Sequence, residues 1–470
     1  MSNLLKKVSF VRLTLIAILL IQIVVILNIR PWKNAEKQNA LINWDVTSYY
    51  SYLPAVFVHQ DLKFNFLKNS TTNYAEKHQF WPETAPNGNK VIKTTMGMSI
   101  LYLPFFLVAH AFAILSPEIN ANGFSKVYEI GLTFSCVFYL IIGMYFLSKV
   151  LLRLYHKKIV SILLLLVFLG SNLFFYSTSE PCMSHAYTFS LASILMYLTT
   201  KVFKRFDLKT AVLLGLILGL LFLVRPTNIL FGLVCFLFNV YSWKSFKKRL
   251  LWSLENTKLL VLTILVTLSI CSIQFIYWKW ATGDWIFNSY IGERFYFDRP
   301  RILNFLFSYR KGWLVYSPIF VLSFLGIYKM IKNKNEWGLP IIITLIATIY
   351  LFSSWWCWWF GGGFGMRPMI DYYPLLIIPI GELLNQKLAL LKNGVLTFII
   401  VGISFNLFQT LQRRNLVIHW DSMSKNSYWA FFTTIKMESR KDWERQESLL
   451  MKPNYDKARK GESEYDFEIL

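Results

Sequence analysis

The sequence predicts an all-α polytopic membrane protein. More than half of its 470 residues are apolar and only 16% are charged. Apolar runs of about 20 residues, the length that crosses the hydrocarbon core of a bilayer, recur from near the start of the chain almost to Leu411. This composition is that of a membrane protein, and no separate soluble domain fits between the runs.

The first apolar run, 8–29, is expected to be a retained membrane anchor. It follows Lys6 and Lys7 but is longer than the core of a signal peptide, and no small-residue cleavage site follows it.

The formal net charge of +23 comes from short basic clusters between apolar runs. That distribution predicts topology under the positive-inside rule, not a nucleic-acid site. The clusters are 6–12, 149–158, 201–209, 244–249, 329–334 and 387–392. Placing all of them in the cytoplasm, together with the N-terminus, predicts eleven spans in the cytoplasmic membrane. These are about 8–29, 128–147, 159–176, 185–203, 211–226, 227–242, 259–278, 313–330, 339–354, 370–386 and 394–412.

The segment 96–115 is long enough to be a twelfth span. Counting it would move 149–158 and every later basic cluster to the outside, so we interpret it as a re-entrant or interfacial helix. Pro104 and His110 fit an imperfect span. Residues 30–127 then form one long outer loop with membrane-lying helices. The transmembrane part is residues 1–412, and the polar tail 413–470 is expected to be extracytoplasmic and to fold against the membrane or the body.

Asp45 is the first candidate for chemistry. It lies in WDVTSYYSYLPA at 44–55, the first polar stretch after the first span. A carboxylate there could act as general base toward an acceptor hydroxyl, or stabilise charge that develops at a sugar carbon. The alternative is a helix N-cap, a position that Asp favours.

Two arginines on the predicted outer face are candidates for binding a lipid phosphate. Arg225 lies between two spans, and Arg367 follows three glycines and Gly365. The guanidinium fork suits phosphate oxygens, and glycines allow close backbone approach. The alternatives are a structural pair of Arg225 with Glu180 or Asp371, and snorkelling of Arg367 to the interface.

Aromatic residues admit two interpretations, an interfacial belt or a surface that stacks on sugars. They form one cluster around Asp45, with Trp44 and Tyr49, and a second run, 355–360, which reads WWCWWF. Asp61, Lys93, Glu180 and His185 are second-rank candidates, because a lone charged residue in a loop is usually only solvated and His185 could merely cap a helix. The long outer loop holds no paired DxD, so no divalent metal is implied.

Taken in order, these stretches resemble the GT-C glycosyltransferases, which include protein O-mannosyltransferases, the oligosaccharyltransferase catalytic subunit and the bacterial enzymes that add aminoarabinose to lipid A. They look most like an uncharacterised bacterial branch of mannosyltransferase-like membrane proteins. The stretches that carry the resemblance are 44–55, KTTMGMSILYLPFFLVAHAF at 93–112, SEPCMSHAYTF at 179–189, GLILGLLFLVRPTN at 215–228, GWLVYSP at 312–318 and WWFGGGFGMRPMIDYYP at 358–374.

The resemblance implies a sugar donor linked to a polyprenyl phosphate or diphosphate, and transfer to a hydroxyl of a glycan, lipid or protein at the outer face. Asp45 matches the family's early acidic position, and Arg225 and Arg367 match basic positions near the donor phosphate. The acidic pair that holds a metal in the oligosaccharyltransferase branch is missing from the loop, which favours the metal-independent branches and no cofactor beyond the lipid-linked sugar. Substrate-binding roles are expected for Lys93, Glu180, His185, Trp44, Tyr49 and Asp371.

Two rival interpretations remain open. One is a transporter or flippase of lipid-linked sugars, although the chain shows no convincing internal repeat and its candidate polar groups gather at the outer ends of the spans. The other is a polymerase or ligase of surface polysaccharide, which typically has its main outer loop late in the chain, whereas the long loop here comes first.

Overall fold

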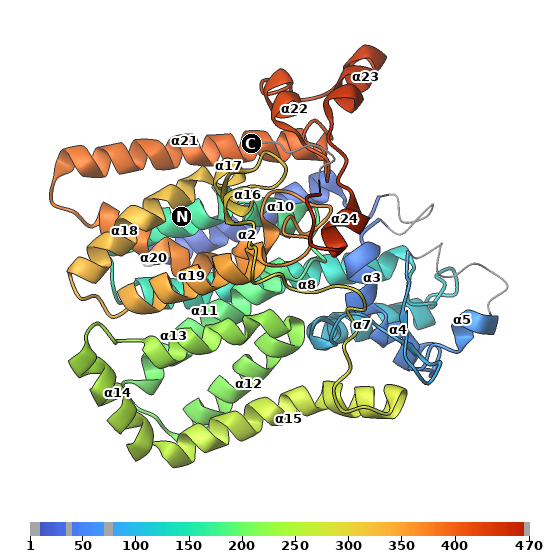
Figure 1. The fold of residues 1–470 in the computed structure, drawn as a ribbon, viewed down its shortest axis with the longest axis horizontal. Helices are drawn as coiled ribbons and strands as arrows, with labels where there is room; N and C mark the ends of the chain where they lie inside the picture. The colour runs from blue at the N-terminus through green and yellow to red at the C-terminus, as the bar shows by residue number, and fades with distance from the viewer. Residues whose placement is uncertain (1–9, 34–39, 70–78, 465–470) are drawn as a thin grey trace.

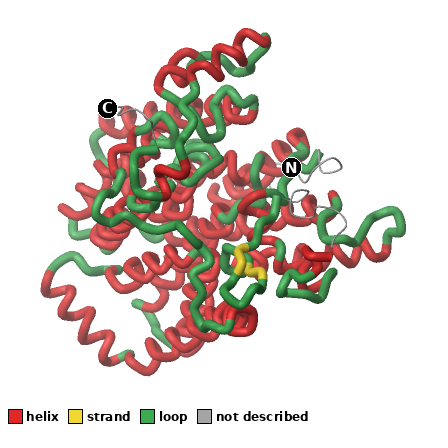
Figure 2. Tube along the Cα trace, turned by 45° about the vertical axis from the view of Figure 1, so that its right-hand side comes forward, coloured by secondary structure: helices red, strands yellow, loops and turns green. Residues whose placement is uncertain are grey.

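The computed structural model describes residues 10–33, 40–69 and 79–464, and this part of the chain is predominantly helical (Figures 1 and 2). Strand occurs among the described residues as one small antiparallel hairpin, β1 (Glu83–Thr84) with β2 (Lys90–Val91). The predicted all-α class is confirmed.

Five helices are long and apolar enough to cross a membrane. They are α2 (Phe10–Ile29), α7 (Gly97–Leu115), α8 (Lys126–Leu151), α15 (Thr257–Thr282) and α21 (Ala389–Arg414). A protein with this set of helices is embedded in a membrane. Four of the five coincide with predicted spans, and α7 is the segment predicted to lie in the interface.

The other predicted spans fall on shorter or less apolar helices. These are α9 (Lys157–Leu169), α11 (His185–Val202), α12 (Leu208–Val224), α13 (Phe231–Leu237), α18 (Val321–Lys332), α19 (Gly338–Ser353) and α20 (Tyr373–Leu384). Breaks shorten several of them, because Pro226 and Pro318 each open a short 3₁₀ turn where proline has no N–H to continue the preceding helix. Hydropathy runs across such breaks, and the count of eleven spans stays a prediction.

Short helices fill the connections. They are α3 (Trp44–Tyr50), α4 (Tyr52–Phe57), α5 (Phe66–Asn69), α10 (Leu173–Thr178), η1 (Pro226–Leu230), α14 (Trp243–Glu255), α16 (Ile302–Phe307), α17 (Trp313–Tyr316), η2 (Pro318–Phe320), η3 (Arg367–Tyr372), α22 (Lys425–Ala430), α23 (Arg440–Leu449) and α24 (Tyr455–Arg459).

Helices α12 and α15 pack side by side and run in the same direction (Figure 1). The Thr263 hydroxyl donates to the carbonyl of Ala211, and one turn further along Thr267 donates to Gly215. A Cβ on Gly215 would lie 2.6 Å from the Thr263 carbonyl oxygen. The Gly-x-x-x-Gly spacing of residues 215 and 219 therefore sets a close helix contact, as small residues do between helices in membranes.

Helix α7 lies against the first half of α8. His110 Nδ1 is 2.6 Å from the Tyr128 hydroxyl, and Tyr139 donates to the carbonyl of Leu101 at 3.2 Å. Two well-separated points of α7 thus meet α8 within its first fourteen residues. This geometry is compatible with a helix that does not cross the bilayer, but α7 is also long enough to span it, so its interfacial placement stays a prediction.

The segment that carries Asp45 is anchored by a buried carboxylate. Glu129 Oε1, in the first turn of α8, accepts from the backbone N–H groups of Leu41 and Ile42 at 2.8 and 3.1 Å. The Ser99 hydroxyl of α7 donates to the carbonyl of Tyr49. These bonds hold α3 at the end of the bundle where α8 begins.

The C-terminal tail packs on the loops that precede α17 and η3. Arg310, which is buried, donates to the carbonyls of Asp421 and Met451 at 3.0 and 2.9 Å, and Tyr296 donates to the carbonyl of Arg459. In Figure 1, α22 and α23 stand out from one end of the bundle, while α24 lies back against it. The tail is thereby part of the structure around the glycine-rich segment.

Candidate functional site

Asp45 forms an ion pair with Arg367. Its Oδ2 accepts from the Arg367 Nη2 at 2.8 Å, and its side chain remains 47% exposed while that of Arg367 is 12% exposed. The N-cap position of α3 is taken by Asn43, and Asp45 lies inside the helix. The alternative interpretation of Asp45 as an N-cap is therefore wrong.

Arg367 begins η3 and points into the protein. Its Nη2 also donates to the carbonyl of Phe360 at 2.7 Å, whereas its Nε is buried and has no partner among the described residues. Nη1 has only the Met183 sulfur at 3.9 Å. The snorkelling interpretation is wrong, because the side chain is buried and paired. The guanidinium retains donors that an anion could use.

The ionisation of Asp45 reflects two opposed effects. Burial in this region raises the pKa of Asp45, and the Arg367 guanidinium, with help from Arg225 and Lys93, holds it below its ordinary value. Asp45 is consequently a carboxylate at neutral pH. The effect of Arg225 and Lys93 also shows that both cations lie near this carboxylate.

The segment 360–365, here called the glycine loop, shapes the site around Arg367. Gly365 has φ +59°, and a Cβ there would lie 2.9 Å from the Cβ of Tyr316. At Gly363 a Cβ would lie 2.5 Å from the Tyr176 hydroxyl oxygen, which accepts from the N–H of Phe364 at 2.7 Å. A side chain at either position would displace its neighbours, so glycine is needed for this backbone path.

A second cluster joins Arg225 to the buried side chains of His185 and Asp371. The His185 Nδ1 is 3.0 Å from Asp371 Oδ1, Arg225 Nη1 is 3.6 Å from Asp371 Oδ2, and Arg225 Nη2 is 3.5 Å from His185 Nε2. The alternative interpretation of Arg225, a structural pair, holds for Asp371 and is wrong for Glu180. Because arginine has only donors, the histidine Nε2 facing it must be the unprotonated nitrogen, so Nδ1 donates to Asp371.

Lys93 and Tyr49 border the same region. Lys93 Nζ pairs with Glu293, a residue that was not among the predicted candidates and that no motif singles out. Tyr49, which is buried, lies beside Arg225. The three cations near Asp45 therefore each have a carboxylate partner: Arg367 has Asp45, Arg225 has Asp371 and Lys93 has Glu293.

Glu180 pairs instead with Arg413, at 3.5 Å. The Arg413 Nε donates to the Gly363 carbonyl at 3.2 Å, and the Lys311 Nζ donates to the same carbonyl and to that of Trp420, at 2.6 Å in the second case. Lys311 and Arg413 were not selected from the sequence, although both are positive charges on the predicted outer face, the signal that singled out Arg225. Both side chains hold the glycine loop through the carbonyl of Gly363.

Most of the aromatic run 355–360 is core. Trp356, Trp358 and Trp359 are buried, and the indoles of Trp358 and Trp359 donate to Glu464 and Asp421 of the tail at 3.0 and 3.2 Å. The belt interpretation is wrong for these three residues, and they present no open face to a sugar.

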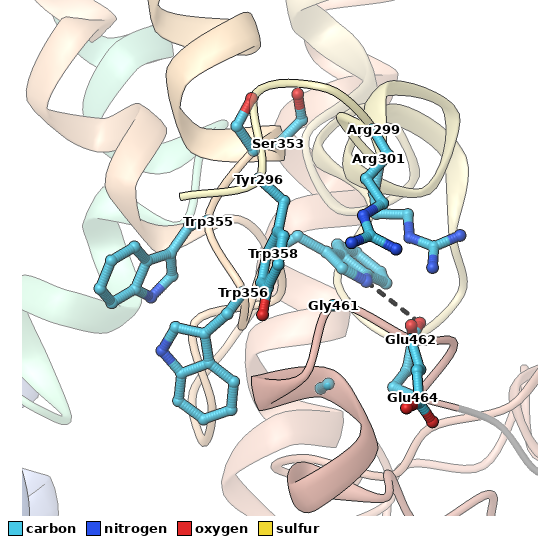
Figure 3. Close-up of a pocket in the computed structure, with 12 residues that line it drawn as sticks. Tyr296, Arg299, Arg301, Ser353, Trp355, Trp356, Trp358, Gly461, Glu462 and Glu464 are labelled. Atoms are coloured by element: carbon cyan, nitrogen blue, oxygen red, sulfur yellow. Dashed lines mark hydrogen bonds between the residues drawn. The ribbon is translucent and has the colours of Figure 1, made fainter. Parts of the chain in front are cut away.

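A small pocket lies where this run meets the tail. Figure 3 shows Trp355 and Trp356 on one side and Arg299, Arg301, Glu462 and Glu464 on the other, with Trp358 between them. None of the predicted site residues lines it. It is therefore separate from the ion pairs around Asp45.

Trp44 is the aromatic residue left accessible beside Asp45. It is 62% exposed, and its ring centroid is 5.5 Å from that of Trp81. Its φ of +47° is uncommon for a side-chain-bearing residue. Trp44 and Trp81 thus form an exposed aromatic pair next to the carboxylate.

The described residues contain no group of three or more His, Cys, Asp or Glu side chains placed to hold a metal ion. The expectation that the protein needs no metal stays a prediction. Comparison with protein-family models, with curated proteins and with solved structures found no match.

Proposed function

We propose that this protein is a membrane glycosyltransferase of the GT-C type that moves a sugar from a polyprenyl-phosphate donor to an acceptor hydroxyl at the outer face of the cytoplasmic membrane. The observation that carries the proposal is the environment of Asp45, an ionised and half-exposed carboxylate with Arg367 bonded to it and with Arg225 and Lys93 nearby. One base and several cations are what the transfer requires.

In the proposed reaction an Asp45 oxygen takes the proton of the acceptor hydroxyl as its oxygen attacks the anomeric carbon. The bond from that carbon to the donor phosphate breaks with inversion, and the electron pair leaves with the phosphate. Arg367 and Arg225 stabilise the negative charge that develops on the leaving oxygen. Because a phosphate is a good leaving group, the step needs little acid assistance.

Arg367 has two roles in this proposal. Without a donor it holds Asp45, and with a donor its unpaired Nε and weakly engaged Nη1 turn to phosphate oxygens. Each bond that Arg367 makes to phosphate weakens its hold on Asp45, whose pKa then rises because burial is less opposed. A carboxylate with a higher pKa is a stronger base, so donor binding would activate Asp45.

A lipid-linked donor fits the position of these groups. Arg225 follows the last residue of α12, His185 is the first of α11, and Asp371 lies in η3, two residues before α20 begins. Charged groups at the ends of apolar helices meet a phosphate at headgroup level while its polyprenyl chain remains in the hydrocarbon. The eleven-span topology, with residues 30–127 and the tail outside, is part of the same proposal. The exposed pair of Trp44 and Trp81 is available to stack on a sugar face.

The test is reconstitution of the purified chain in vesicles with radiolabelled polyprenyl-phosphate sugars and a panel of glycan, lipid and protein acceptors. We expect labelled product to form together with free polyprenyl phosphate. If label moves between leaflets without transfer to any acceptor, the protein is a transporter and the proposed function is wrong.

A further inference from the structure

Helix α14 (Trp243–Glu255) has two distinct faces. One face is bound to the protein: the Arg249 guanidinium lies 3.6 Å above the Phe203 ring and donates to the carbonyl of Phe238, and Trp252 packs on Phe203 with ring centroids 4.7 Å apart. These contacts leave the opposite side of α14 without a protein neighbour among the described residues.

The opposite face is apolar and exposed. Trp243, Leu250 and Leu254 recur at the spacing of one helical face, and Leu254 is 71% exposed. A soluble surface does not normally leave a tryptophan and several leucines of one helix open to water. The pattern is that of an interfacial helix with its apolar face in acyl chains.

Lysines border this apolar face. Lys244, Lys247 and Lys248 are all exposed, and the Lys247 ammonium lies 5.8 Å from the Trp243 ring centroid. The neighbouring basic stretch 201–209 is held beside α14 by Phe206, whose ring stacks on Trp252 at 5.6 Å. The acidic residues of the two stretches are Asp207 and Glu255. This surface is therefore strongly positive.

The fold places α14 at the level of one membrane surface. It joins α13 to the start of α15 and runs across their axes (Figure 1). The parallel contacts of α12 with α15 put α14 at the end of α12 opposite Arg225, and the 17 residues of α12 are about 25 Å long. That length approaches the thickness of a hydrocarbon core, so α14 lies at the other surface of the membrane.

We propose that α14 is a binding site for anionic lipid headgroups in the leaflet opposite the Asp45 site. Leu250, Leu254 and Trp243 enter the acyl region, and Lys244, Lys247 and Lys248 contact the phosphates. Charge complementarity identifies the occupant, because a lone apolar face would accept any lipid, whereas lysines along its border select negative ones. This inference needs α12 to cross the membrane, but it does not depend on the proposed transfer reaction.

The first test measures lipid selectivity. The full chain is placed in nanodiscs of phosphatidylcholine or of an equimolar mixture with phosphatidylglycerol, and the lipids that copurify after detergent extraction are quantified. We expect phosphatidylglycerol to be enriched with the wild type. In K244Q/K247Q/K248Q the affinity for this lipid should fall by about fivefold for each lysine removed, so the enrichment should be lost. The matched control K329Q/K332Q/K334Q removes the same charge from another basic cluster and is expected to retain it. Equal enrichment in both variants would overturn the proposal.

The second test measures depth. A spin label at Leu254→Cys is compared with one at Lys248→Cys in the same nanodiscs, with the unsubstituted protein labelled in parallel as background. We expect the label at 254 to be reached by oxygen and shielded from a water-soluble nickel reagent, and the label at 248 to show the reverse. A label at 254 that the nickel reagent reaches, or that a second copy or another protein shields from both reagents, would overturn the proposal.

Discussion

Asp45 and Arg367 lie 322 residues apart in the sequence and are joined by a bond of 2.8 Å. Asp45 is on the first short helix after α2, and Arg367 opens the turn before α20. The bond unites two sequence stretches that had each been chosen for a different reason, one for a carboxylate and the other for glycines followed by an arginine. It makes the behaviour of each residue depend on the other.

Replacement of Asp45 by Asn should abolish transfer and preserve the fold. Asn has the shape of Asp but cannot take a proton, and loss of a positioned base typically reduces a rate by about 10²–10⁴-fold. The measurement is initial velocity in vesicles, with donor binding and thermal unfolding recorded alongside. Asp284→Asn, an exposed acid of another loop, is the control and should be fully active. Full activity of Asp45→Asn in a folded protein would refute the assignment of the base.

Replacement of Arg367 by Gln should move the acid limb of the pH profile upward. Arg367 lowers the pKa of Asp45 and burial raises it. Removal of an adjacent cation shifts a carboxyl pKa by about 1–3 units, so protonation would silence the variant at higher pH than the wild type. Residual transfer at saturating donor gives the profile, and isotope-edited infrared spectroscopy of the carboxyl gives the pKa directly. Arg299→Gln serves as control. An unmoved acid limb together with an unmoved carboxyl pKa would contradict the proposed coupling.

Asp371→Ala should destabilise the protein strongly. Asp371 is fully buried, and its removal leaves Arg225 without its carboxylate and His185 without its acceptor. Breaking one side of a buried pair costs about 3–5 kcal/mol, and the double variant Asp371→Ala/Arg225→Met should recover much of it. Glu180→Ala, in a more exposed pair with Arg413, should cost about 0–1 kcal/mol. Denaturation in detergent measures all three, and equal losses for Asp371→Ala and Glu180→Ala would show that burial of the pair is unimportant.

Lys311 should make stability depend on pH in the alkaline range. Burial, aided by Arg413, holds the pKa of the Lys311 ammonium well below its ordinary value. The unfolded chain therefore binds a proton that the folded chain lacks between that lowered pKa and about 10.4, and stability rises with pH across the interval. A neutral amine still has two N–H groups for the carbonyls of Gly363 and Trp420.

The comparison of wild type with Lys311→Met checks this point. The unfolding free energy of the wild type minus that of Lys311→Met should increase with pH, by at most about 1.4 kcal/mol per pH unit. Lys332→Met, at an exposed lysine, should follow the wild type. A difference that stays constant from neutral pH to about 10 would mean that Lys311 is charged in the folded protein.

Labelling of single cysteines should place the end of α7. The interfacial interpretation predicts that Glu118→Cys, which follows α7, reacts with an impermeant maleimide from the same side as Thr84→Cys, an exposed position that precedes α7. Lys332→Cys should react from the other side. Oriented vesicles with intact and permeabilised membranes provide the measurement. Reaction of Glu118→Cys and Thr84→Cys from opposite sides would show that α7 crosses the bilayer.

The helical class and the positions of most apolar helices were predictable, because about 20 apolar residues have few alternatives in a bilayer. The breaks that divide these apolar segments into separate helices were not predictable. Leu169 ends α9, and a new helix begins at Leu173, but the three residues between them are too few to divide the apolar run in a hydropathy average. Pro318 is itself a signal for a helix break, but hydropathy averaged over its apolar neighbours does not show the break.

The candidate site was predictable residue by residue but not as a set of pairs. Asp45, Arg225 and Arg367 were conspicuous because charges are rare near apolar runs. Nothing local indicated that Arg367 would bond to Asp45, or that Glu293 would take Lys93, since such pairs depend on how distant helices pack. Trp358 and Trp359 were misread because a run of tryptophans at a span end is also the signature of a belt, and only the packed tail distinguishes the two.

The bond between Asp45 and Arg367 also has a consequence for how the chain is made. Ribosomes add about 5–20 residues per second, so the first partner of this 322-residue connection waits roughly 15–60 seconds for the second to be synthesised. The Glu129 carboxylate, which emerges much earlier, can already hold the segment at Leu41 and Ile42. A chain terminated before residue 367 would therefore present Asp45 without its arginine, and no product that short would carry the complete site.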